Sequence, residues 1–155
     1  MGRCRKTRKS TSGGAILIGN HCIRSWSKTQ AIIATSSGEA ELYGSNKTTS
    51  ECLGMQSLAE DFGDTMQVQV LVDASAALGI IRRRGLGKTR HIRVQELWCQ
   101  ELSSSGRVKF LKVNGKRNPA DMMTKCIDER GILKNTYLLH LQFRIGRSST
   151  APEIS

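Results

Sequence analysis

The spacing of apolar residues predicts that the chain opens with a hairpin and continues into a long helix. The apolar run 15–18 and the segment 21–26 flank Gly19-Asn20, a pair typical of the turn between two strands. Over residues 39–62 the apolar positions follow helical spacing. Ser36 or Ser37 is a plausible N-cap for this helix, and Gly63 supplies a stop. We therefore expect two short strands followed by a helix of several turns.

Further along the chain, the same patterns predict two more strands and three more helices. Residues 68–72 and 107–113 alternate as strands do, and we expect the first of these strands to be buried largely on both faces. One helix should follow Asp73, and a longer one should cover 89–102. Asn118-Pro119 is a strong start signal for the last of the three. This order predicts an α/β fold, with helices covering a mixed sheet.

The length of the chain and the composition of its two ends predict three parts. A chain of 155 residues is enough for one ordinary domain, which we place at 10–127. Residues 1–9 carry five basic and no acidic side chains, and we expect them to form a basic N-terminal arm. Residues 128–155 are weakly patterned, and we expect a tail that is partly helical, with a helix around 137–143, or disordered.

Charge and cysteine content favour some classes of partner and exclude others. The 24 lysines and arginines against 13 acids give a net charge of +11, which attracts nucleic acid, although a basic surface can also serve solubility alone. Five scattered cysteines without a C-x-x-C pair argue against a zinc or redox motif. They indicate a reducing compartment, cytoplasmic or nuclear. No apolar run reaches the length of a membrane span, so we expect no membrane partner.

Three acids occupy positions at which α/β folds gather chemistry. Glu41 lies near the start of a predicted helix, Asp73 at the end of a predicted strand, and Asp121 in the first turn after Pro119. Each also has a structural explanation, since acids often cap helices, complement helix dipoles or face solvent. Together, in a basic chain, they suggest carboxylates that gather two Mg²⁺ ions beside a phosphate backbone. No nucleophile and histidine stand at a spacing that suggests a catalytic triad.

Several sequence blocks in register make the chain similar to a known family. It resembles the ribonuclease H region of copia-type retrotransposon polyproteins, and the likeness covers about residues 8–127. The blocks are 8–14 (RKSTSGG), 25–30 (SWSKTQ), 36–41 (SSGEAE), 70–73 (VLVD), 88–92 (KTRHI) and 118–121 (NPAD), the last followed by Thr124-Lys125.

The resemblance implies a ribonuclease H-like mixed sheet of five strands flanked by helices. It implies magnesium-dependent hydrolysis of the RNA strand of an RNA/DNA hybrid, with reverse transcriptase and other upstream polyprotein segments as partners and no small-molecule substrate. It assigns the metal-binding and catalytic roles to Glu41, Asp73 and Asp121. Glu41 is preferred to Glu39, because residues two apart on a helix point to different sides.

One departure from the family pattern affects both fold and activity. The family's leading aspartate precedes the RKSTSGG block, whereas this sequence has no acid before Glu39. We therefore expect the first, central strand and its ligand to be missing, which would leave an incomplete two-ion site and a marginal fold. The alternatives to an active hydrolase are a catalytically inactive remnant that binds nucleic acid and a decayed fragment without a stable fold.

Polar and basic residues near these acids are candidates for contacts with nucleic acid. Hydroxyl groups ahead of the first helix could donate to the RNA strand, including its 2′-hydroxyls, and the basic link after residue 81 could contact phosphates. The candidates are Thr35, Ser36, Ser37, Arg83, Arg84, Lys88, Arg90, His91, Asn114 and Lys116. A solvated basic helix edge explains the arginines and lysines equally well.

Overall fold

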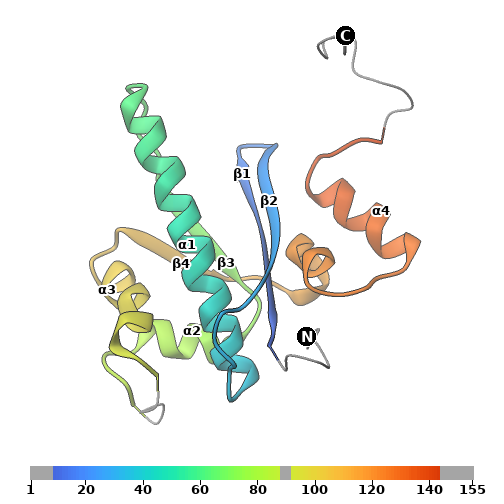
Figure 1. Ribbon diagram of the computed structural model, residues 1–155. Helices are drawn as coiled ribbons and strands as arrows, with labels where there is room; N and C mark the ends of the chain where they lie inside the picture. The colour runs from blue at the N-terminus through green and yellow to red at the C-terminus, as the bar shows by residue number, and fades with distance from the viewer. Residues whose placement is uncertain (1–8, 88–91, 144–155) are drawn as a thin grey trace, which may run out of the picture.

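A computed structural model describes residues 9–87 and 92–143 as short strands and helices around one long helix (Figure 1). In chain order the elements are β1 (Thr11–Ile18), β2 (His21–Thr29), α1 (Ser37–Asp61), β3 (Val68–Val72), α2 (Ser75–Arg82), the 3-10 helix η1 (Val94–Leu97), α3 (Trp98–Ser104), β4 (Val108–Lys112), the 3-10 helices η2 (Gly115–Arg117) and η3 (Pro119–Met123), and α4 (Glu129–Leu138). Within the described ranges, no helix has the length and apolar character needed to cross a membrane.

The described strands form two separate sheets of two strands each. β1 and β2 make an antiparallel hairpin around Gly19, whose φ of 58° suits glycine, and the predicted turn is confirmed. β3 and β4 pair in parallel, with Val68 opposite Val108. The fold is mixed α/β, as predicted. The expected mixed sheet is divided into two small sheets, because no described strand joins β1 to β3.

The long helix α1 packs against both sheets. Its start is confirmed, since the Ser36 side chain accepts a hydrogen bond from the backbone of Glu39, and Gly63 follows its end with a φ of 84°. Leu42 and Thr49 are completely buried in its first half. The second half reaches beyond the sheets (Figure 1), and Phe62 on its apolar stripe is 79% exposed.

The main core lies between the β3–β4 sheet and helices α1, α2 and α3. Leu42, Val70, Ile81, Val108 and Phe110 are among its buried residues. In β3, the residues Val68, Val70 and Val72 are buried, whereas Leu71 is 58% exposed. The expectation of a strand buried on both faces is therefore wrong, because α1 and α2 cover only one face.

Three helices begin or end elsewhere than predicted. The helix expected over 89–102 begins later, as η1 and α3, although Ile92 and Leu97 are buried as expected; residues 88–91 lie outside the described part. Asn118 caps the predicted start at Pro119, but the helix is a 3-10 helix of five residues. In the tail, Asp128 caps α4 by accepting from the Gly131 backbone, so the helix ends near where we expected it to begin.

Candidate functional site

A groove of about 460 Å³ separates the two sheets. One wall is β1, from Thr11 to Leu17, and the other is β3 from Gln69 onward together with Asp73, the residue after it. The floor is a stripe of α1 that includes Gly44 and Thr48, and η3 contributes residues at one end. The groove therefore collects side chains from elements far apart in the sequence.

All three predicted acids line this groove. Glu41 comes from the second turn of α1, Asp73 from the residue after β3, and Asp121 from η3. Asp73 does not cap α2, since the N-cap residue is Ala74 and no side chain caps that helix. Asp73 also lies close to η2, because a Cβ atom added at Gly115 would stand 3.8 Å from its Oδ2 atom.

The three carboxylates influence one another, and Lys125 offsets part of their charge. Partial burial, followed by the charges of Asp73 and Asp121, raises the pKa of Glu41 above its usual value of 4.5. Lys125 acts in the opposite direction and lowers that pKa. Its Nζ atom donates to Asp121 Oδ2 at 2.9 Å, and this bond raises the pKa of Lys125 itself. The acids thus share one electrostatic environment, with a lysine as the nearby counter-charge.

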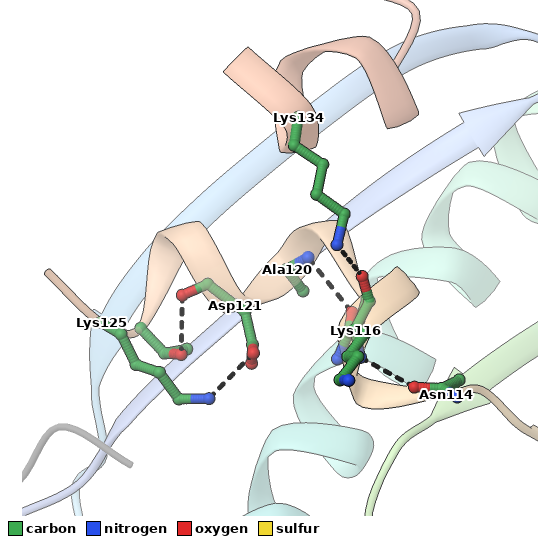
Figure 2. A network of polar contacts seen from close by, with 8 residues as sticks. Asn114, Lys116, Ala120, Asp121, Lys125 and Lys134 are labelled. Atoms are coloured by element: carbon green, nitrogen blue, oxygen red, sulfur yellow. Dashed lines mark hydrogen bonds and ion pairs between the residues drawn. The ribbon is translucent and has the colours of Figure 1, made fainter. Parts of the chain in front are cut away.

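The donor chemistry suits magnesium, although the three carboxylates are not gathered as closely as the ligands of a bound ion. Mg²⁺ prefers carboxylate oxygens and water, and three carboxylates face the groove. Across residues 9–87 and 92–143, however, no three acidic, histidine or cysteine side chains gather closely enough to hold an ion. Figure 2 shows the Asp121 carboxylate of η3 turned toward Lys125, which lies two residues beyond the end of that helix. In this arrangement Lys125 offsets the negative charge of Asp121.

The two glutamates at the start of α1 have different environments. Glu39 is only 3% exposed, and its carboxylate accepts from the backbone N–H and the hydroxyl of Thr35 and from the Tyr43 hydroxyl. Burial, and then the hydrogen bond to Glu39, raises the pKa of Tyr43. Glu39 therefore anchors the loop before α1, while Glu41 faces the groove as the resemblance implied.

Thr35 and Ser36, before α1, are exposed, but their hydroxyl groups already make hydrogen bonds that stabilise the start of the helix. Thr35 Oγ1 donates to Glu39 at 2.6 Å, and Ser36 Oγ accepts from the Glu39 backbone at 3.1 Å. Ser37 is also exposed. The capping role of Ser36 was expected from the sequence, whereas the bond from Thr35 to Glu39 was not.

The basic link after α2 is only partly described. Arg84 is exposed, whereas Arg83 is half-buried and its guanidinium donates to the Leu86 carbonyl at 2.6 Å. Arg83 therefore stabilises its own loop. Lys88, Arg90 and His91 lie outside the described residues.

Asn114 and Lys116 form an exposed turn beside the groove. Asn114 caps η2, because its side chain accepts from the Lys116 backbone at 3.0 Å. Lys134 from α4 donates to the Lys116 carbonyl, and the Lys116 ammonium is not part of that bond (Figure 2). Lys116 is thus an exposed cation on a capped turn, next to Gly115, which lies close to Asp73.

Lys125 had no predicted role, although the sequence contains a signal for its contact with Asp121. Lys125 stands four residues after Asp121, the spacing at which opposite charges meet on a helix.

A comparison with known proteins gives one informative similarity. Over 122 residues, 77% of this chain, the sequence is 29% identical to the Retrovirus-related Pol polyprotein from transposon TNT 1-94 of Nicotiana tabacum. The chain spans 9% of the length of that relative. No family model and no solved structure matches the chain. The chain is therefore similar to a short part of a retrotransposon Pol polyprotein.

Proposed function

We propose that this chain is a retroelement-derived, ribonuclease H-like domain of copia type whose partner is an RNA/DNA hybrid. The observation that carries the proposal is that Glu41, Asp73 and Asp121 line one groove in a chain with a net charge of +11. The similarity to a retrotransposon Pol polyprotein supports the same origin. In a parent polyprotein, upstream segments such as reverse transcriptase would supply the hybrid.

In the arrangement described here, binding of the hybrid is favoured over its hydrolysis. The ancestral reaction, magnesium-dependent cleavage of the RNA strand, requires carboxylates gathered around metal ions. The described acids do not gather in this way, and Lys125 pairs with Asp121. Positive charge alone is enough to hold a phosphate backbone. We therefore propose a binding function, with hydrolysis as the second candidate.

Binding is tested by the fluorescence anisotropy of a labelled hybrid over a range of salt concentrations. The logarithm of the affinity should fall linearly with the logarithm of salt concentration. Arg84→Gln and Lys116→Gln should each reduce that slope by about 1 if each side chain contacts one phosphate. Lys47→Gln is the matched control, because Lys47 already pairs with Glu51. Affinity that is independent of salt would contradict the proposal.

Hydrolysis is tested on the same hybrid with Mg²⁺ and with a chelator. If the chain binds without cleaving, the two reactions should show the same intact RNA strand. Cleavage that requires Mg²⁺ and is abolished by Asp73→Asn would establish the second candidate instead. Asp64→Asn is the control, since Asp64 is exposed and is not among the groove residues.

A further inference from the structure

A second pocket lies away from the three acids, where the end of β2 and the loop after it meet α1. Its volume is about 230 Å³. Residues 28–32, Tyr43 and Lys47 of α1 and Glu96 of η1 are among the residues that line it. The described lining includes none of the three groove acids. We call it the Gln30 pocket.

Gln30 provides this pocket with a buried hydrogen-bond acceptor in a fixed orientation. The side chain is 8% exposed, and its Nε2 atom donates to Ser12 Oγ at 2.8 Å and to the Ala40 carbonyl at 2.7 Å. Since a backbone carbonyl only accepts, these bonds fix the position of the amide nitrogen and use both of its N–H groups. The Gln30 Oε1 atom has no hydrogen-bond partner within the described part of the chain. Because an unpaired buried acceptor is unfavourable, a ligand N–H next to Gln30 would gain a hydrogen bond that the fold leaves open.

Glu96 supplies a second acceptor to the same pocket. Its carboxylate accepts a hydrogen bond from Asn46 Nδ2 at 3.1 Å, and a carboxylate has room for about four donors. Two acceptors suit a ligand group with two N–H donors, and an amino group on an aromatic ring is such a group. An aliphatic ammonium also has donors, but Lys28 and Lys47 line the pocket and would repel its charge. The two acceptors therefore favour an uncharged aromatic amine.

Other lining residues suit a planar ring that carries a phosphate. Tyr43 is half-buried and Ile32 is 37% exposed, so both offer apolar surface against which a base can lie. The Lys47 ammonium pairs with Glu51. Lys28 is exposed beside the pocket and can bond to a phosphate that stays in solvent.

We propose that the Gln30 pocket binds an unpaired nucleotide whose base bears an exocyclic amino group. The amino group donates to Gln30 Oε1 and to the Glu96 carboxylate, and the phosphate bonds to Lys28. A base within a duplex is stacked and paired, so it enters such a pocket only after it leaves the helix. The proposal therefore goes beyond the proposed binding of an RNA/DNA hybrid and does not depend on it.

The ligand is tested by titrating AMP and CMP into the nitrogen-labelled full chain, followed by NMR, which also detects weak binding. Saturable shifts that include the side-chain amide signal of Gln30 are expected for both. Each nucleotide is compared with an analogue that has hydrogen in place of the amino group, and with its nucleoside, which lacks the phosphate. Each loss should weaken binding about tenfold. Absence of binding by both nucleotides, or equal affinity with and without the amino group, would overturn the proposal.

Two pairs of exposed substitutions test the site on the protein. Lys28→Gln removes the cation beside the pocket, and Lys109→Gln is its control, because Lys109 is exposed on β4 and does not line the pocket. Ala31→Phe places a ring in the pocket, and Ser25→Phe is its control at an exposed position of β2 outside it. Both pocket variants should bind AMP about tenfold more weakly, and both controls should bind it as the original chain does. Circular dichroism checks that all four fold. Equal effects within either pair would contradict the assignment.

Discussion

Replacing Glu39 and Glu41 separately by glutamine should distinguish an acid that stabilises the fold from an acid that only lines the groove. Both lie in the first turns of α1, two residues apart, and both changes remove one charge with little change in shape. Glu39 accepts three hydrogen bonds, two from Thr35 and one from Tyr43, at 2.5 to 2.7 Å. Glu41 instead has a raised pKa, so the fold disfavours its charge.

These contacts determine the expected change in the free energy of unfolding for each variant. A hydrogen bond to a charged group contributes about 1 kcal/mol more than a neutral one, so Glu39→Gln loses roughly 3 kcal/mol over three bonds. The Tyr43 hydroxyl can rotate to accept from the new amide, which reduces the expected loss to about 2 kcal/mol. Glu41→Gln relieves repulsion from Asp73 and Asp121, and the free energy of unfolding should stay within about 0.5 kcal/mol or rise.

Urea denaturation at neutral pH, followed by circular dichroism, measures both changes. The two variants should show the same slope with urea, and only Glu39→Gln should have a clearly lower midpoint. The reasoning would be refuted if Glu41→Gln lost as much stability as Glu39→Gln, because Glu41 would then be a structural residue and not a groove acid.

Three further results are expected from the same groove and from the cysteines. Because the folded-state pKa of Glu41 is raised, its contribution to stability is present below pH 4.5 and is lost as the pH rises through the folded value. The free energy of unfolding, measured by denaturation across this window, should therefore decline in the original chain and not in Glu41→Gln. Lys125→Met should raise the pKa of Glu41 further in a carboxyl NMR titration while costing less than about 1 kcal/mol, because the pair with Asp121 is largely exposed; a lowered pKa would argue against this role. Iodoacetamide should modify exposed Cys126 in the folded chain and spare Cys99, whose pKa burial raises to about 11; mass spectrometry of the peptides checks this.

Features that depend on local sequence were predicted well. The turn at Gly19 and the helix start at Ser36 depend on backbone freedom or on a cap within three residues, so the sequence contains all the information needed. The strands at Val68–Val72 and Val108–Lys112 were also predicted from alternation. In contrast, periodicity alone did not show that β3 is covered on one face only, because this depends on where α1 and α2 lie.

The site was predictable in its residues but not in its geometry. The positions of Glu41, Asp73 and Asp121 at element ends suggested a common location, and all three line one groove. An incomplete two-ion site was expected from the missing leading aspartate, but the separation of the three carboxylates across the groove and the bond between Lys125 and Asp121 were not. Long-range spacing of this kind has no signature in a single sequence.

Because α1 contacts both sheets, its orientation affects the distance between the Asp73 and Asp121 carboxylates. Asp121 belongs to η3, which packs against β1, whereas Asp73 ends β3 on the other side of the groove. A change in the tilt of α1 would move these two supports relative to each other. Substitutions buried beneath either sheet, such as at Leu42, would therefore alter the distance between the two carboxylates without touching either one.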